Sequence, residues 1–263
     1  MKVFTCISDV FNPAYKKVLL KSCDYFQLDL NTQIISISRK WISHREKDIQ
    51  LYDFLSTCKK DEIVLFSDGY DTCFLADEIE IVEKYRSLNS DIVISAEINC
   101  HPNKDLEAFY PHQDSKYRFI NSGGFIGTAK SIMKVIESFR GIKETEDSKK
   151  YEWSNQYLWT IAYIEQTVSI KLDAKCSIFQ TLSSERTLLK QILETRDTDY
   201  QMSKALLRQH KENIFGNFKY EGGRIYNINT ESTPAHIHFS SPVLKKAMFE
   251  HPFVSLYPWL LEK

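Results

Sequence analysis

Two carboxylates stand directly behind an apolar run of the sequence. Ile63–Phe66 is continuously apolar, which is typical of a strand covered on both faces, and Asp68 and Asp71 follow it, three positions apart. Ligands of open α/β sheets bind beyond the carboxyl ends of the strands, so we expect both carboxylates at that edge. Mg2+ and Mn2+ prefer oxygen ligands and leave coordination positions for substrate phosphates. The pair indicates such a metal site, with a turn whose aspartates bond backbone amides as the alternative.

Alternating strand and helix patterns must position these carboxylates. The alternation predicts an α/β fold with a parallel sheet covered by helices, and its strand-like runs lie at 2–8, 33–36, 62–66 and 91–95. A further strand at 119–127 is interrupted by paired glycines, and helical patterns occupy 78–87 and 155–164. The polar stretch at about 183–218 predicts a helical insertion or lid.

The composition excludes several classes of protein. With 263 residues, 43% hydrophobic and 26% charged, the chain suits a single globular domain, and it has no apolar run of membrane-spanning length. A formal charge of -1 gives no field that favours nucleic acid. Six cysteines without a CxxC pair suggest reduced core thiols, and residues 1–8 resemble a first strand more than a secretion signal. We therefore expect a cytoplasmic chain.

Several segments together resemble a known family, the glycosyltransferase domain of the procollagen lysyl hydroxylases. The similarity is in order and spacing and covers nearly the whole chain; it rests on Leu65–Asp71, Ser95–Glu97, Cys100–Pro102, Phe119–Gly127, Leu172-Asp173, Ile178–Gln180 and Pro234 through His238 to Pro242. It implies a single GT-A domain over residues 1–263, Rossmann-like, with a mixed, mostly parallel sheet flanked by helices. The chain departs from the family's His-Gly-Asn-Gly, because His238 is followed by Phe239-Ser240-Ser241.

The resemblance also implies a metal site. Asp68, Asp71 and His238 would bind Mn2+, which in turn holds the diphosphate of a UDP-sugar. An imidazole ligand suits Mn2+ better than Mg2+, although Mg2+ stays open as the ion. The alternative for His238 is a core histidine on a strand whose other inward residue is His236.

Donor-binding residues follow from the same resemblance. Trp41 and Tyr70 resemble residues that pack on the uridine, for which an aromatic face is a suitable partner. Thr5 and Ser8 end the first strand, where they can hydrogen-bond the nucleotide. Lys47 would reach a phosphate or the base. Ordinary core packing is the alternative for Trp41 and Tyr70, and a solvated helix-terminal lysine is the alternative for Lys47. Small polar residues such as Thr5 and Ser8 are also common at strand ends.

The family's sugar-facing wall corresponds to Asn121, Ser122, Gly123 and Gly124, whose amides and hydroxyl would bond sugar hydroxyls. A β-bulge is the alternative for the two glycines. We also count Asn121 among the candidate catalytic residues.

The catalytic carboxylate is the main departure from the family. Where the family has a run of aspartates, this chain reads Glu152–Gln156, and Asn155 can hydrogen-bond a sugar hydroxyl but cannot act as a carboxylate nucleophile or base. Asn155 and Glu152 are the catalytic candidates here, with a solvated loop as the alternative for the acids upstream, Glu144, Glu146, Asp147 and Glu152. His101 replaces a family tryptophan, and we expect substrate preference to shift there.

The resemblance implies transfer of glucose from UDP-glucose to galactosyl-hydroxylysine of a collagen-like chain, with retention of configuration. Mn2+ would act as Lewis acid and template. Galactose transfer from UDP-galactose to hydroxylysine, transfer to another acceptor, and a non-catalytic UDP-sugar-binding protein are the alternatives. A haloacid dehalogenase-type phosphatase is disfavoured, because its aspartates are two positions apart.

The chain looks like a stand-alone version of the domain, such as giant viruses encode for their own collagens. This would place it in the cytoplasm of an infected host cell. A homodimer stays open, and the acceptor partner would be a collagen-like glycopeptide.

Overall fold

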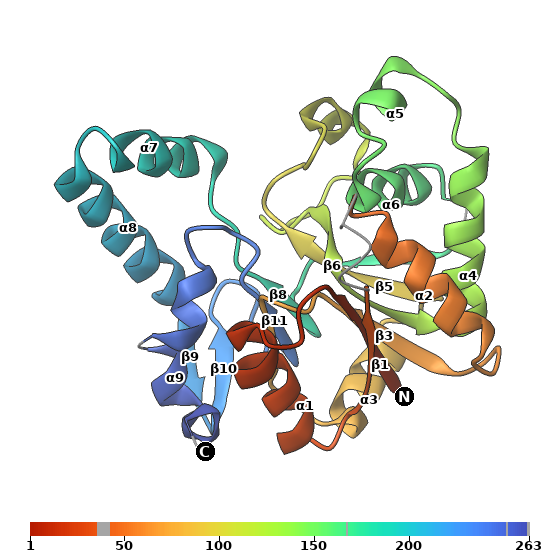
Figure 1. Ribbon diagram of the computed structural model, residues 1–263, viewed down its shortest axis with the longest axis horizontal. Helices are drawn as coiled ribbons and strands as arrows, with labels where there is room; N and C mark the ends of the chain where they lie inside the picture. The colour runs from red at the N-terminus through yellow and green to blue at the C-terminus, as the bar shows by residue number, and fades with distance from the viewer. Residues whose placement is uncertain (36–42, 167, 251, 262–263) are drawn as a thin grey trace.

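Six strands form the central sheet, in the order β2-β1-β3-β6-β5-β7 (Figure 1). The computed structural model describes residues 1–35, 43–166, 168–250 and 252–261. Among these strands β6 is antiparallel to its neighbours β3 and β5, and the other pairs are parallel. The mixed, mostly parallel sheet is therefore confirmed. The strand bounds are β1 Lys2–Ile7, β2 Asp29–Ile34, β3 Ile63–Ser67, β5 Ile92–Glu97, β6 Phe119–Thr128 and β7 Ile170–Asp173.

Alternate residues of each strand point to opposite faces of the sheet, and helices cover both faces. Phe4 and Phe66 belong to the core beneath α2, α4 and α6, whereas Val3 and Leu65 belong to the core beneath η1, α1 and α3. The helix bounds are η1 Tyr15–Leu20, α1 Lys21–Tyr25, α2 Glu46–Ser56, α3 Glu78–Ser87, α4 Ala129–Ser138 and α6 Asn155–Ile164. The bounds of α3 and α6 match the sequence prediction, and side chains of Asp77 and Ser154 cap their first turns.

A second, three-stranded sheet brings the end of the chain to the edge of the first. Its order is β4-β11-β8, with bounds β4 Thr72–Phe74, β11 His236–His238 and β8 Phe179–Thr181. β11 pairs antiparallel with β4, so that His238 is opposite Thr72, the residue after Asp71. A histidine 167 positions later in the sequence is thereby placed beside the carboxylates that follow β3.

The stretch predicted as a helical insertion contains two helices, α7 Arg186–Arg196 and α8 Tyr200–Phe215, which project at the upper left of Figure 1. A hairpin follows, β9 Phe218–Glu221 and β10 Arg224–Asn227, turning at two glycines with positive φ. None of the helices within the described ranges is long and apolar enough to cross a membrane. The remaining short elements are η2 Lys104–Phe109, η3 Phe139–Gly141, α5 Glu146–Lys150, η4 Lys245–Phe249, α9 Phe253–Leu256 and η5 Pro258–Leu260.

Candidate functional site

A cavity of about 510 Å³ lies at the carboxyl ends of β3 and β5. This is the sheet edge at which α/β proteins bind ligands. Elements far apart in the sequence meet there, including the start of α2, the middle of β6, the start of α6, the start of α7 and the segment after β11. Residues predicted for the site that line the cavity are Lys47, Asp68, Asp71, Asn121, Ser122, Gly123, Asn155 and His238.

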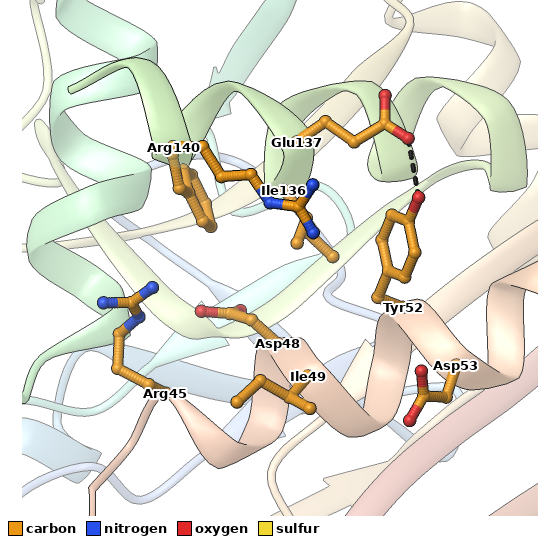
Figure 2. Close-up of a pocket in the computed structure, with 9 residues that line it drawn as sticks. Arg45, Asp48, Ile49, Tyr52, Asp53, Ile136, Glu137 and Arg140 are labelled. Atoms are coloured by element: carbon orange, nitrogen blue, oxygen red, sulfur yellow. Dashed lines mark hydrogen bonds between the residues drawn. The ribbon is translucent and has the colours of Figure 1, made fainter.

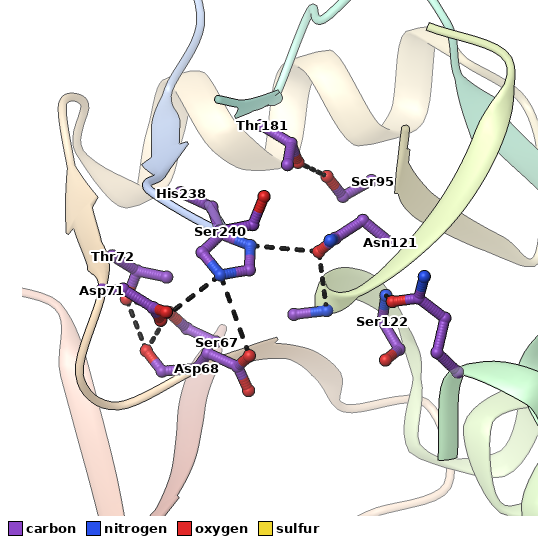
Figure 3. Close-up of polar contacts among 12 residues, drawn as sticks. Ser67, Asp68, Asp71, Thr72, Ser95, Asn121, Ser122, Thr181, His238 and Ser240 are labelled. Atoms are coloured by element: carbon purple, nitrogen blue, oxygen red, sulfur yellow. Dashed lines mark hydrogen bonds and ion pairs between the residues drawn. The ribbon is translucent and has the colours of Figure 1, made fainter. Parts of the chain in front are cut away.

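Asp68, Asp71 and His238 converge on one point, and one ligand atom from each lies within 4.8 Å of the others. His238 Nε2 is 3.3 Å from Asp71 Oδ1 and 3.8 Å from Asp68 Oδ2 (Figure 3). Two carboxylates and an imidazole form a donor set that suits a divalent cation, and Mn2+ accepts such mixed oxygen and nitrogen ligands. The residues therefore fit the predicted metal.

Two lysines pair with the same carboxylates. Lys47 Nζ is 2.5 Å from Asp68 Oδ1, and Lys245 Nζ is 2.8 Å from Asp71 Oδ2. Burial opposes the charge of Lys47, but the Asp68 carboxylate outweighs it and raises the pKa of Lys47. Burial likewise opposes the charge of Asp71, yet His238 and Lys245 hold its pKa well below the usual range. The sequence did not point to Lys245, which is the first residue of a short helix three positions after Pro242.

The ring of His238 is oriented by Asn121. Asn121 Oδ1 is 3.0 Å from His238 Nδ1 and also accepts a hydrogen bond from the backbone N–H of Gly123, while Asn121 Nδ2 donates to Glu97 Oε1 at 3.1 Å. Because an amide oxygen only accepts, the hydrogen bond assigns the ring proton to Nδ1. Nε2 faces the two aspartates and is the ring nitrogen that a metal bound between them would take.

Glu97 is a buried carboxylate on the cavity wall that the sequence predictions did not include. Besides the Asn121 amide, Gln156 Nε2 donates to Glu97 Oε1 at 2.9 Å and Ser183 Oγ donates to Oε2 at 3.0 Å. Burial raises the pKa of Glu97, and these donors partly offset the rise. An acid at the end of the apolar strand Ile92–Ala96 is the signal that could have identified it.

Gly123 of β6 leaves room for the side chains of Asp68 and His238. A Cβ at Gly123 would lie 2.3 Å from His238 Cε1 and 2.9 Å from Asp68 Oδ2, so a side chain does not fit there. Gly124 does not line the cavity. It faces Phe179 instead, since a Cβ at Gly124 would lie 2.9 Å from the ring of Phe179. The pairing of β5 with β6 is irregular over Asn121–Gly124, so the bulge and the cavity wall coincide.

The residues predicted to hold the nucleotide are placed less directly. The hydroxyl of Tyr70 accepts hydrogen bonds from the backbone N–H groups of Ser8 at 2.8 Å and Asp9 at 2.6 Å, which ties this turn to the end of β1. Thr5 is fully buried. Tyr70, Ser8 and Thr5 are not among the cavity-lining residues, and Trp41 lies outside the described residues. Their nucleotide contacts stay predictions.

Asn155 and Glu152, the two candidates for acceptor-side chemistry, occupy different environments. Asn155 is buried on the cavity wall, and its Oδ1 accepts a hydrogen bond from Ser122 Oγ at 3.3 Å. Glu152 is exposed and is not among the lining residues. The geometry therefore gives Asn155, but not Glu152, access to a substrate in the cavity.

A second cavity, of about 290 Å³, lies between α2 and α4 (Figure 2). Its side chains include Arg45, Arg140 and Asp48, and Asp48 Oδ1 accepts a hydrogen bond from Trp159 Nε1 at 3.1 Å. Burial raises the pKa of Asp48 to about 6, although Trp159, Arg45 and Asn155 oppose the rise. This cavity lies between two helices on one face of the sheet. Among the described residues it contains no group of three side chains that could hold a metal ion. We therefore place the functional site in the first cavity.

Known proteins resemble this chain over much of its length. The family model described as PLOD GT domain matches residues 14–222. Procollagen-lysine,2-oxoglutarate 5-dioxygenase 1 of Mus musculus is 36% identical over 128 residues, which are 47% of this chain and 16% of the mouse protein. The uncharacterized protein R699 of Acanthamoeba polyphaga mimivirus is 32% identical over 164 residues, 59% of this chain and 34% of the viral protein. The alignments thus span a minor part of each relative's length.

The matched range is well over half of the chain and contains both aspartates, Asn121 and Asn155. The α/β architecture, with its mostly parallel sheet flanked by helices, agrees with the GT-A fold expected of such a domain. Fold, cavity and family model lead to one conclusion. The chain belongs to the family of PLOD glycosyltransferase domains.

Proposed function

We propose that this domain is a Mn2+-dependent transferase that moves glucose from UDP-glucose to galactosyl-hydroxylysine of a collagen-like protein, with retention of configuration. The observation that carries the proposal is the convergence of Asp68, Asp71 and His238 on the cavity floor. The names of its relatives, enzymes that act on procollagen lysine, support a collagen-like acceptor.

Asp68, Asp71 and His238 would hold the metal, which supplies positive charge for a diphosphate leaving group. Lys47 and Lys245 line the same cavity and would add donors for phosphate oxygens, as lysine does in other phosphate sites. These residues would bind the donor through its charged part, which UDP-glucose and UDP-galactose share. Donor sugar preference would therefore depend on the wall formed by Asn121–Gly123 instead.

On the acceptor side, Asn155 and Ser122 would orient a sugar hydroxyl through hydrogen bonds. Glu97 is a carboxylate at the cavity wall whose pKa is raised by burial, and it would be the acid nearest to hand for taking up the proton of an acceptor hydroxyl. A carboxylate at Glu97 would make up for the missing aspartate run without requiring Glu152.

The proposal is tested by incubating the purified chain with UDP-glucose or UDP-galactose, in Mn2+ or EDTA. Peptides with galactosyl-hydroxylysine or with free hydroxylysine serve as acceptors, and the products are identified by mass spectrometry. We expect metal-dependent gain of one hexose from UDP-glucose on the galactosylated peptide. Transfer from UDP-galactose to free hydroxylysine would replace the proposed reaction with the first alternative.

A non-catalytic UDP-sugar-binding protein is the second candidate. The observation in its favour is that Asn155 lacks the acid of the family motif and that Glu152 is exposed. Tight Mn2+-dependent UDP binding without release of UDP from either donor, with or without acceptor, would establish it.

A further inference from the structure

The rim of the cavity carries an aromatic side chain that the proposed donor site does not use. Trp153 lines the cavity and is 41% exposed. It precedes Ser154, whose side chain caps α6, so the start of that helix fixes its position. Single exposed apolar side chains are common on protein surfaces, but this one borders a cavity lined by polar groups.

Two histidines pack against Trp153. The ring centroids of His44 and His101 lie 5.9 and 6.3 Å from that of Trp153, and the backbone N–H of His44 donates to the Trp153 carbonyl oxygen at 3.0 Å. Burial lowers the pKa of both histidines, and Lys47 and Arg186 reinforce the effect. The rings are thus uncharged at neutral pH, and an uncharged imidazole has one donor and one acceptor nitrogen.

This combination matches the surface of a sugar ring. A hexopyranose has a face of C–H groups that packs on an aromatic ring and an edge of hydroxyls that needs uncharged donors and acceptors. We propose that Trp153, with His44 and His101 packed against it, binds the sugar ring of a glycosylated acceptor. The inference rests on the proposed function, because it takes the donor to occupy Asp68, Asp71, His238 and Asn121–Gly123.

The assignment to the acceptor follows from which elements supply each wall. The donor would occupy the metal ligands and Asn121–Gly123. Trp153, His101 and Arg186 come instead from the segment before α6, the loop after β5 and the start of α7, while His44 lies just before α2, three positions from Lys47. An acceptor hydroxyl must approach the donor sugar from the wall that the donor leaves uncovered. Asn155, which contacts Ser122, joins the two walls.

Kinetics on Trp153→Ala and Trp153→Phe test the proposal. We expect Trp153→Ala to raise the KM for the galactosyl-hydroxylysine peptide about tenfold, while Trp153→Phe, which keeps an aromatic face, raises it less than about threefold. The KM for UDP-glucose and its acceptor-free hydrolysis stay unchanged. Tyr220→Ala is the matched control, because Tyr220 is 45% exposed, also has a ring neighbour and does not line the cavity.

A binding measurement separates this inference from the proposed function. Saturation-transfer NMR with methyl β-galactoside, in the presence of UDP and Mn2+, reports sugar binding without turnover. We expect contact with the wild-type chain and with Trp153→Phe, and its loss in Trp153→Ala. A rise in the KM for UDP-glucose in Trp153→Ala would assign the ring to the nucleotide base and overturn the inference. Unchanged galactoside contact in a folded Trp153→Ala would overturn it as well.

Discussion

The two walls of the cavity are built in different ways. On the metal side, Asp71 and His238 are almost fully buried, and each has charged or hydrogen-bonding partners that fix its side chain. On the acceptor side, Trp153 is 41% exposed and has ring contacts in place of a polar network. Stabilising a diphosphate leaving group requires charges held in fixed positions, whereas binding an acceptor requires a surface whose shape fits the acceptor.

The same division separates what this chain shares with its family from what it changes. Asp68, Asp71 and Asn121 belong to segments that resemble the family, and the side chains of all three contact His238. Among the departures, the exposed residues His101 and Trp153 lie at the rim of the cavity, Asn155 is buried in its wall, and Glu152 does not line it. A substitution at the rim changes few contacts, so we infer that substrate preference can change there without loss of metal binding.

Removing a proposed metal ligand should give the largest effect on metal affinity and turnover. Asp71→Asn removes a carboxylate that His238 and Lys245 both contact. We expect Mn2+ affinity, measured by titration calorimetry, and UDP-glucose turnover to fall by more than about 100-fold, since even outer partners of metal ligands are worth about 10- to 100-fold.

Asp61→Asn is the matched control, because Asp61 is exposed and outside the cavity. Wild-type Mn2+ affinity in a folded Asp71→Asn would mean that the three converging side chains are not the metal site.

The second-largest effect is expected at Asn121. A catalytic role and a role in positioning His238 predict different results for this residue. Asn121→Ala releases the Nδ1 edge of His238, so we expect Mn2+ affinity to fall about 10- to 100-fold. Ser95→Ala is the control, since it removes a buried hydrogen bond to Thr181 in neighbouring strands. Lower turnover with unchanged Mn2+ affinity would instead support the catalytic role.

Much of the fold could be predicted because the pattern is local. The helices at 78–87 and 155–164 have capping residues and apolar periodicity in the sequence itself. β4 and the β9–β10 hairpin were missed, because a strand of three or four residues has too few positions to establish a period. The antiparallel direction of β6 depends on distant strands, which no local pattern encodes.

The site divides along the same principle. Asp68 and Asp71 follow a recognisable strand, so chemistry and position could be inferred together. Lys245 and Glu97 escaped prediction because their roles depend on what folds beside them: Lys245 meets Asp71 across 174 positions, and Glu97 needs the Asn121 amide as a partner. The hydroxyl of Tyr70 accepts a hydrogen bond from the backbone N–H of Ser8, a contact that the sequence did not predict.

A smaller effect, on the free energy of unfolding, is expected at Asp48. This residue lies near Asn155, behind the proposed acceptor wall. Its pKa of about 6 in the folded chain exceeds the value of about 3.9 for an unperturbed aspartate, so the free energy of unfolding falls as pH rises from about 4 to about 6. Asp48→Asn removes that charge and keeps an acceptor for Trp159. We expect it to raise the free energy of unfolding by about 2 kcal/mol at pH 8, but not below about pH 4. Urea denaturation at both pH values measures this, and an equal change at both would rule out ionisation as the cause.

The smallest effect is expected at Glu152, which sharpens the contrast between the two walls. Its carboxylate is exposed and outside the cavity lining, whereas Asn155 is buried and bonded to Ser122. Glu152→Gln should therefore change turnover with the galactosylated peptide by less than about twofold, while Asn155→Ala should lower it about tenfold or more with Mn2+ affinity intact. A large loss in Glu152→Gln would mean that the loop before α6 closes over the acceptor and brings this acid to it. The acceptor wall would then be assembled by the substrate, and the metal wall alone would be preformed.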